Sequence, residues 1–216
     1  MRRLLLTTAL LLALPASALS ALITVTVTDD GTNVGTFTSG TGAISWTTSD
    51  GNFADISGDA SGTPLLPNAD LSSTALNVRD TSVGTHTLVI TVDQTGVSGV
   101  GPTMSTFTTN NLVGAPNIDT TEETLANGIG LVTHNFPAGT VSGHAGPFDV
   151  AFGAISSDEH VYTIVFTGAG SSNDTVQLTT GLVIPEASTW VMMALGFGLL
   201  GLVGYGKSRH PREMAA

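Results

Sequence analysis

The sequence predicts an all-β protein whose body is a single β-sandwich, and three observations carry this prediction. First, β-branched residues alternate with polar residues along several short stretches, which is the period of a strand with one buried face. Second, clusters of Gly, Asn and Asp separate those stretches, and these residues tolerate the backbone conformations of tight turns. Third, residues 21–184 show no convincing 3.6-residue apolar repeat. Short strands with Gly-rich connections favour two sheets packed face to face.

Four stretches show the strand pattern most clearly: residues 22–28, 86–93, 160–167 and 175–180. In the third of these, alternation would bury Tyr162, Ile164 and Phe166 on one face. Weaker candidates are residues 34–38, 43–48, 74–79, 106–109, 130–134 and 149–155. The aromatic side chains expected in the core are Phe37, Trp46, Phe53, Phe107, Phe148, Phe152, Tyr162 and Phe166.

The connections between these stretches differ in character. Residues 29–33, DDGTN, lie between two strand patterns and predict a hairpin. Residues 119–128, DTTEETLANG, are the one plausible short helix. Residues 137–147, which contain two prolines and three glycines, indicate a long loop. No internal repeat or domain boundary is visible, so residues 21–182 are expected to form one sandwich domain.

The charge of this body is strongly one-sided. Between Ala21 and Ala187, sixteen Asp and Glu stand against a single Lys or Arg, Arg79, which leaves a net charge of −15. Such a surface repels the phosphates of nucleic acids and anionic lipid headgroups, which argues against both as partners. Cations, neutral glycans and other proteins remain open. The chain has no cysteine, so neither a disulfide framework nor a thiolate nucleophile is available.

The N-terminal residues have the layout of a secretory signal peptide. Two arginines precede an apolar run over residues 4–14, and small residues follow. The small-x-small rule favours cleavage after Ala18, with cleavage after Ser20 as the alternative. An amphipathic helix does not fit because the run has no polar face. Residues 1–20 are therefore expected to direct export through the Sec translocon.

The C-terminal residues have the same two features in the opposite order, an apolar run followed by basic residues. The run from Trp190 to Tyr205 carries no charge, and as a helix it would be about 24 Å long. Flanking Ser, Thr and Gly extend it toward the ~30 Å of a hydrocarbon core, and its two terminal aromatic residues suit the membrane interfaces. Lys207, Arg209 and Arg212 follow directly and favour a cytoplasmic end. The expected topology is an acidic body outside, one membrane-spanning helix and a short basic tail inside.

The order of features in residues 183–216 resembles a PEP-CTERM sorting signal. Pro185 and Glu186 come first, an apolar Gly-rich span follows, and a basic end closes the chain. The usual form is Val-Pro-Glu-Pro, whereas here Ile184 precedes the pair and Ala187 replaces the second proline. A proline at this place prevents the helix from continuing upstream, and a glutamate suits the positive end of the helix.

The resemblance implies a location and a partner. Proteins with this signal are exported by Gram-negative bacteria that typically make extracellular polysaccharide. An exosortase-type membrane enzyme processes them near the Pro-Glu pair. By this resemblance the protein would be held at the inner membrane, at least transiently, through its C-terminal helix. It would then act at the cell surface or in the extracellular matrix, with exopolysaccharide as a candidate partner.

Motifs for catalysis are missing from the body. It has no G-x-S-x-G elbow, and a phosphate-binding loop would need a lysine that the body lacks. The body's four histidines never occur as H-E-x-x-H. Asp158, Glu159 and His160 set two carboxylates beside an imidazole, but a solvated turn before a strand explains them more simply. No catalytic residue and no cofactor is assigned.

Calcium is the best of the weak ligand hypotheses. One apparent loop holds Asp50, Asn52, Asp55 and Asp59, and another holds Asp29 and Asp30. Clustered carboxylates suit hard cations, yet the spacing is not that of an EF-hand loop. Solvated turn acids explain the pattern more simply, so no metal ligand is assigned.

The leading expectation is a non-enzymatic, exported cell-surface or matrix protein. The rival is a secreted glycan-binding or glycan-cleaving β-sandwich module. A glycosidase would need two carboxylates about 5 to 10 Å apart across a cleft, and nothing in the sequence marks such a pair. A sugar-binding face would need exposed aromatic rings, whereas Trp46, the only tryptophan of the body, fits a core position better.

Overall fold

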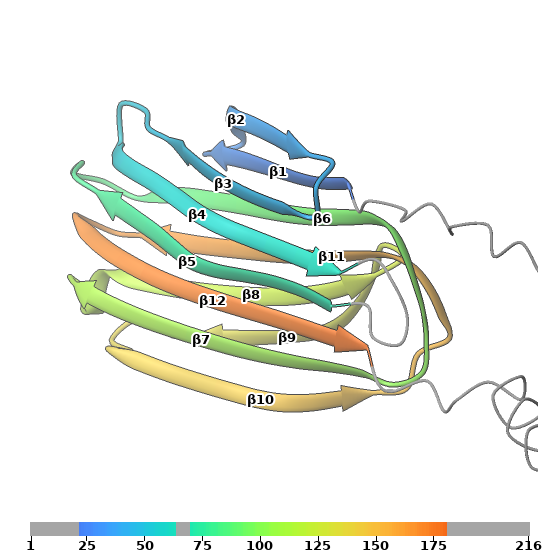
Figure 1. Cartoon of the computed structure of the whole chain (residues 1–216). Coiled ribbons are helices and arrows are strands. Elements are labelled where there is room, and N and C mark those ends of the chain that lie inside the picture. The colour runs from blue at the N-terminus through green and yellow to red at the C-terminus, as the bar shows by residue number, and fades with distance from the viewer. Residues whose placement is uncertain (1–21, 64–69, 181–216) are drawn as a thin grey trace, which may run out of the picture.

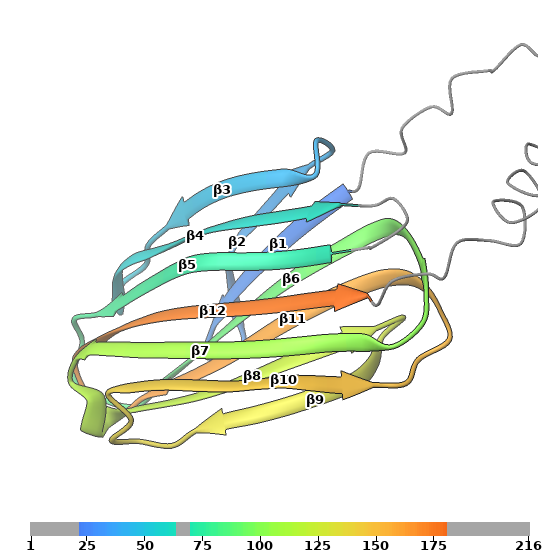
Figure 2. The same ribbon diagram turned by 60° about the horizontal axis from the view of Figure 1, so that its bottom comes forward.

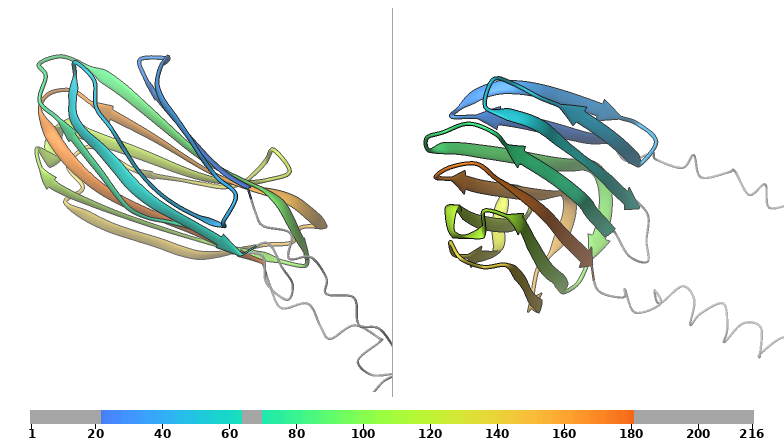
Figure 3. Two further views of the ribbon diagram at one scale, coloured as in Figure 1. Left: turned by 45° about the horizontal axis from the view of Figure 1, so that its top comes forward. Right: turned by 90° about the vertical axis from the view of Figure 1, so that its left-hand side faces the viewer.

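The computed structural model describes residues 22–63 and 70–180, which form two six-stranded antiparallel sheets packed face to face (Figure 1). The order in sheet A is β2-β1-β6-β11-β8-β9, and the order in sheet B is β10-β7-β12-β5-β4-β3. The predicted all-β class with two sheets is therefore confirmed. Figures 2 and 3 show the two layers from other sides.

The strand bounds are as follows. Sheet A contains β1 (Leu22–Asp29), β2 (Thr32–Ser39), β6 (His86–Val100), β8 (Ile118–Ala126), β9 (Ile129–Phe136) and β11 (Ala154–Phe166). Sheet B contains β3 (Ala43–Thr48), β4 (Phe53–Thr63), β5 (Asp70–Asp80), β7 (Thr103–Val113), β10 (Ser142–Val150) and β12 (Gly170–Thr180). A single 3-10 turn, η1 (Ala115–Asn117), leads from β7 into β8.

The clearest sequence patterns are strands, and the predicted hairpin is confirmed. Asp30 and Gly31 join β1 to β2 with φ angles of 46° and 78°. Positive φ at both central residues makes a two-residue hairpin turn whose twist matches that of the strands. In β11 the side chains of Tyr162, Ile164 and Phe166 are buried, as the alternation predicts.

One segment predicted as a helix and part of one predicted as a loop form strands instead. The helix expected over residues 119–128 is wrong, because residues 118–126 form β8 and Asn127-Gly128 is a hairpin turn. The long loop expected over residues 137–147 is wrong in its second half, because β10 begins at Ser142. β10 is an edge strand with a bulge between Ala145 and Phe148, and edges tolerate the glycine and proline found there.

The interior has an apolar half and a polar half. Aliphatic side chains of β1 and β6 pack against those of β4 and β5, and aromatic residues close this part of the core. Five predicted core aromatics are buried: Trp46, Phe53, Phe107, Tyr162 and Phe166. Phe37 and Phe148 pack against this core while partly buried, Phe152 belongs to a smaller cluster, and the buried Phe136 was missed. Most of the buried polar side chains lie between β8 and β11 on one side and β7 and β12 on the other, where they alternate with apolar ones such as Phe107 and Val176.

The edge strands of the two sheets contact each other, β2 with β3 on one side of the sandwich and β9 with β10 on the other. On one side the Thr48 hydroxyl of β3 donates to the Val34 carbonyl of β2 at 3.1 Å, and the rings of Phe37 and Trp46 stack with centroids 5.8 Å apart. On the other side, the rings of His134 on β9 and Phe148 on β10 lie with their centroids 6.1 Å apart. These contacts limit the unpaired backbone that an edge strand exposes.

The described chain begins and ends at the same end of the sandwich (Figure 1). Leu22 pairs with Thr95 near the end of β6, and Thr180 pairs with Thr103 at the start of β7. Only residues 101–102 separate β6 from β7. We call this the terminal end, and we call the opposite end, with the turns at residues 30–31, 49–52 and 81–85, the loop end.

No helix within residues 22–63 and 70–180 has the length and hydropathy of a membrane span. The span predicted from Trp190 to Tyr205 lies outside the described residues, as does the signal peptide predicted over residues 1–20.

Candidate functional site

The residues assigned to sorting all lie outside the part of the chain that the structure describes. They are Pro185, Glu186, Trp190, Tyr205, Lys207, Arg209 and Arg212. The candidate sites within the described residues are therefore an acidic cluster and a surface hollow at the loop end, and a polar cluster in the interior.

At the loop end, Asp29, Asp30 and His86 bring three potential ligand atoms within 4.8 Å of one another. The hairpin turn places the two aspartates, and β6 begins with the histidine. Asp30 Oδ2 lies 3.1 Å from His86 Nδ1, and Asp30 Oδ1 accepts the Thr87 N–H at 2.9 Å. The Thr87 hydrogen bond lowers the pKa of Asp30, and His86 adds a smaller effect in the same direction.

Asp29 differs from its neighbour because its side chain is buried. Burial raises the pKa of Asp29, and the hydrogen bond that Asn52 Nδ2 donates to Asp29 Oδ2 at 2.6 Å opposes this. Oδ1 of Asp29 has no hydrogen-bond partner among the described residues. The structure thus brings together Asn52 and the Asp29-Asp30 turn, which are separate in sequence.

The acids grouped in the second predicted loop are not one cluster. Asp50 Oδ1 accepts the N–H groups of Asn52 at 2.8 Å and Phe53 at 2.7 Å, so it shapes the β3–β4 turn. Asp55 and Asp59 lie on β4 and are exposed, which contradicts the idea of a single acidic loop.

The Asp29-Asp30-His86 group has the donors of a borderline metal site, since imidazole suits zinc and carboxylates suit harder ions. An ion pair between Asp30 and His86, beside a buried carboxyl group, explains the same contacts without a ligand. The assignment of no metal ligand stays a prediction.

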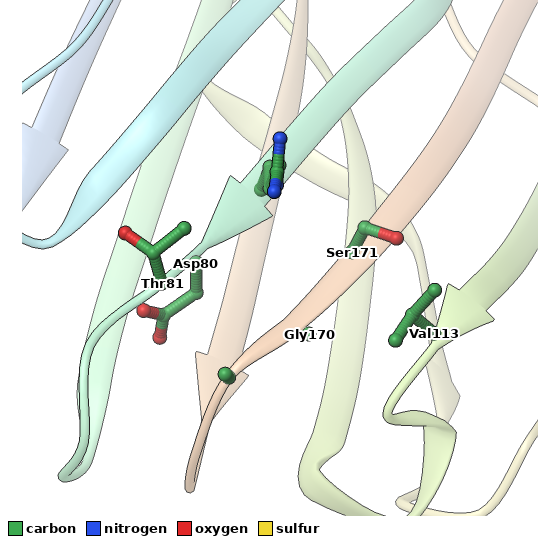
Figure 4. A pocket seen from close by; sticks show the side chains of 7 residues that line it. Asp80, Thr81, Val113, Gly170 and Ser171 are labelled. Atoms are coloured by element: carbon green, nitrogen blue, oxygen red, sulfur yellow. The ribbon is translucent and has the colours of Figure 1, made fainter.

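A surface hollow of about 420 Å³ opens nearby, at the loop end of sheet B (Figure 4). Its lining comes from the end of β5, the end of β7 and the start of β12: Arg79, Asp80, Thr81, Val113, Ala169, Gly170 and Ser171. In Figure 4 Asp80 and Thr81 lie on one side of Gly170, and Ser171 and Val113 lie on the other. One guanidinium and two hydroxyl groups could hold a carboxylate or sugar hydroxyls here.

The interior holds three buried carboxyl groups, of which only Asp158 was singled out from the sequence, where a solvated turn was expected. Glu122 on β8, Asp158 on β11 and Asp174 on β12 are 0% exposed. Burial and, to a smaller extent, the nearby charge of Asp174 together raise the pKa of Glu122 to about 10. Burial raises the pKa of Asp174 to about 6, and the neighbouring hydroxyls of Thr109 and Ser172 act in the opposite direction. Burial, together with the smaller effects of the charges of Asp70 and Asp93, raises the pKa of Asp158 to about 7.

A serine and a histidine also meet in the interior. The Ser73 hydroxyl lies 2.6 Å from His160 Nδ1 and also contacts the Tyr162 hydroxyl. Tyr162 accepts the Val176 N–H at 3.1 Å. Burial lowers the pKa of His160 to about 3, so the imidazole is neutral. Ser73 and His160 are 4% and 0% exposed, so no substrate reaches this pair, and we assign it to the packing of the two sheets.

Asp158, Glu159 and His160, which the sequence analysis placed in a solvated turn, lie within β11 instead. Asp158 and His160 point into the interior, and Glu159 points to the outer face. Alternation along β11 is the signal that could have placed them, because the buried Tyr162 and Ile164 continue the same face.

Trp46 is 6% exposed, which confirms the core position expected for it. The exposed large hydrophobic residues of the described chain include no aromatic one. Its fully buried carboxylates cannot flank a substrate. These observations weigh against an aromatic sugar-binding platform and against a glycosidase built from the acids of the interior.

No protein-family model and no curated protein matches the chain. Among solved structures, the enzymatically active domain of tailspike protein 4 from bacteriophage CBA120 shares 11% identical residues and a TM-score of 0.32 with it. The match covers 66% of this chain and 19% of the tailspike chain. A likeness of this size carries no inference about activity.

Proposed function

We propose that this protein is a non-enzymatic component of the cell envelope or extracellular matrix of a Gram-negative bacterium. In this proposal it is exported through the Sec translocon, held at least transiently at the inner membrane by its C-terminal helix, and processed by an exosortase near Pro185 and Glu186. The observation that best supports the proposal is that Leu22 and Thr180 lie at one end of the sandwich.

This arrangement suits a body that is attached by one end. The predicted signal peptide joins the body before Leu22, and the predicted sorting signal joins it after Thr180. Both junctions lie at the terminal end, so the translocon and the anchor engage the same end of the domain. The eleven residues of β12 span about 36 Å at ~3.3 Å per residue, so the loop end stands well away from the membrane.

The charge of the body supports the same location. Arg79 is the only Lys or Arg in the described residues, while exposed acids such as Asp55, Asp59 and Asp149 line the outer faces. A surface of this kind stays away from anionic lipid headgroups. In a matrix it would interact with divalent cations and hydroxyl-rich polymers instead.

Mass spectrometry of the protein isolated from its native host tests the proposal. We expect an N-terminus at Leu19 or Ala21 and a C-terminus near Glu186 on the surface-exposed form. Replacing both Pro185 and Glu186 with alanine should leave the C-terminal segment in place and keep the protein in the membrane fraction. The control variant Glu213→Gln should be processed normally. An intact chain in the cytoplasm would refute the proposal.

The glycan-binding alternative keeps one supporting observation, the hollow that contains Arg79, Thr81 and Ser171. Calorimetric titration with acidic and neutral oligosaccharides tests it. Binding that Arg79→Ala abolishes would favour this alternative, whereas absence of heat for every oligosaccharide would leave the hollow without such a role.

A further inference from the structure

The polar half of the interior has a definite register between the two sheets. The hydroxyls of Ser105 on β7 and Thr124 on β8 lie 2.8 Å apart, so these strands face each other directly. Because η1 turns the chain from β7 into β8, the two strands run in opposite directions from this pair toward η1, through Thr109 on β7 and Thr120 on β8. On β12, Asp174 pairs with the same Thr109.

A second contact gives the register between β8 and β12. A Cβ atom on Gly170 would lie 2.9 Å from Ile118 Cδ1, so the starts of the two strands touch. Four residues further along each strand are Glu122 and Asp174. The two carboxyl groups interact electrostatically, which agrees with this register. Glu122 from sheet A therefore faces Asp174 from sheet B, with Thr120 as the next inward residue on β8 and Thr109 of β7 paired with Asp174.

This group of four side chains has oxygen atoms without partners. Each of the four residues is 0% exposed. Among the described residues, no hydrogen-bond partner exists for either carboxylate oxygen of Glu122, for Asp174 Oδ1 or for the hydroxyl of Thr120. The other Asp174 oxygen accepts the Ser172 hydroxyl at 2.7 Å. Native interiors rarely leave so many buried polar atoms unsatisfied, so the group is expected to hold something.

The charges indicate what the group holds. Two buried carboxylates face each other across the sandwich, and no buried Lys or Arg accompanies them in the part of the chain that the structure describes, where Arg79 is exposed. Water can satisfy hydrogen bonds in a polar cavity, but it does not compensate two buried charges, so without a cation Glu122, whose pKa is then about 10, keeps its proton. A divalent cation does both, because it binds oxygen and neutralises two carboxylates.

We propose that Glu122, Asp174, Thr109 and Thr120 form an interior site for a hard divalent cation, for which calcium is the probe. Calcium takes six to eight oxygen ligands from carboxylates, carbonyls and waters, and the free oxygens here are of that class. The site joins sheet A to sheet B, so its occupancy stabilises the sandwich. It is separate from the Asp29-Asp30-His86 group at the loop end and does not depend on the proposed export of the protein.

The first test uses the full-length protein purified in mild detergent. Metal content is measured by inductively coupled plasma mass spectrometry, and the melting temperature is followed with EDTA and then with added calcium. We expect about one calcium per chain, a melting temperature lower by about 5 °C or more in EDTA, and recovery on addition of calcium. No metal, together with a melting temperature that neither EDTA nor calcium changes, would overturn the proposal.

Matched variants locate the effect within the chain. Glu122→Gln should abolish the calcium-dependent shift, whereas Glu123→Gln, on the partly exposed face of the same strand, should keep it. Asp30→Asn should also keep it, because the loop-end group is a different site. If Glu122→Gln does not fold, Asp174→Asn provides the same test.

The variants also identify the alternative occupant. If Glu122→Gln and Asp174→Asn are at least as stable as the wild type and no variant changes metal content, the interior holds water beside protonated carboxyl groups. If only Asp30→Asn loses the calcium response, calcium binds at the Asp29-Asp30-His86 group of the loop end. Either result refutes the interior site without bearing on export or on processing near Glu186.

Discussion

Asp158 shows how the fold changes the chemistry of a single residue. Its side chain is 0% exposed, and neither carboxylate oxygen has a hydrogen-bond partner among the described residues. It stands opposite Gln94 on β6 and Ala126 on β8. Burial raises its pKa to about 7, and the like charges of Asp70 on β5 and Asp93 on β6 contribute. The carboxyl group is therefore protonated in the folded protein at pH values where it is ionised in the unfolded chain.

The pH dependence of stability follows from this difference. Between pH 4 and 7 the native state holds a proton at Asp158 that the unfolded state releases, so the free energy of unfolding falls as pH rises. Above pH 7 Asp158 is ionised in both states, and its buried charge lowers the free energy of unfolding by about 4 kcal/mol at most relative to pH 4. Asp158→Asn removes this cost, so the variant should exceed the wild type by about 1 to 4 kcal/mol at pH 8 and equal it near pH 4.

Urea unfolding from pH 4 to 8 measures the difference between the two proteins. The difference curve isolates Asp158, because Glu122 and Asp174 titrate in both proteins. Asp149→Asn, at an exposed position of β10, is the control and should track the wild type at every pH. A difference that stays constant from pH 4 to 8 would show that Asp158 does not titrate in this range.

At the scale of elements, the β8–β9 turn fixes a bulge in the neighbouring strand. Asn127 has a φ of 52°, and its Oδ1 accepts the N–H groups of Ser156 at 2.7 Å and Ser157 at 3.2 Å. Its Nδ2 donates to the Ala154 carbonyl at 2.8 Å. The register of β11 against β6 shifts between Ile155 and Ser157. One asparagine therefore both closes a hairpin and holds the irregular start of β11.

Two substitutions separate these roles. Asn127→Gly loses the side-chain hydrogen bonds but keeps the left-handed conformation, and we expect it to cost about 1 to 3 kcal/mol. Asn127→Ala loses the same bonds and also places a Cβ atom in that conformation, which adds about 1 kcal/mol. Guanidinium unfolding should therefore rank the wild type above Gly and Gly above Ala. Equal stability of the two variants would show that the conformation carries no cost.

The errors of sequence prediction fall on elements whose inward face is polar. In β8 the buried positions between Ile118 and Ala126 are Thr120, Glu122 and Thr124, so the alternation of apolar residues that marks a strand is absent. The two adjacent glutamates in residues 119–128 therefore favoured a helix, although Asn127-Gly128 is a strong signal for a hairpin turn. Strands with apolar inward faces, such as β1 and β6, were predictable for the opposite reason.

The same cause hid the interior cluster. Glu122 and Asp174 are far apart in the chain, and they meet only because two sheets stack in one register. No local spacing encodes such a meeting. Only part of the loop-end group was predictable. The Asp29-Asp30 turn follows from the local sequence, whereas His86 lies beside it because β1 pairs with β6.

At the scale of the whole molecule, the shared location of Leu22 and Thr180 at the terminal end predicts how the body is oriented on the membrane. If the body is anchored through residues that follow Thr180, the terminal end faces the membrane and the loop end faces outward. Val83, in the β5–β6 turn of the loop end, is 94% exposed. Ala151, exposed between β10 and β11, lies at the terminal end, because the neighbouring Val150 pairs with Thr103.

The absence of cysteine allows this orientation to be measured with single-cysteine variants. In the membrane-held protein, Val83→Cys should react with a bulky maleimide-polyethylene glycol several-fold faster than Ala151→Cys, because the membrane and the anchor crowd the terminal end. A small maleimide should modify both at similar rates, which controls for local exposure of the thiols. Once the C-terminal segment is removed, the two rates with the bulky reagent should converge. If Ala151→Cys reacts as fast as Val83→Cys while the chain is still anchored, the body does not stand on its terminal end and the proposed attachment is wrong.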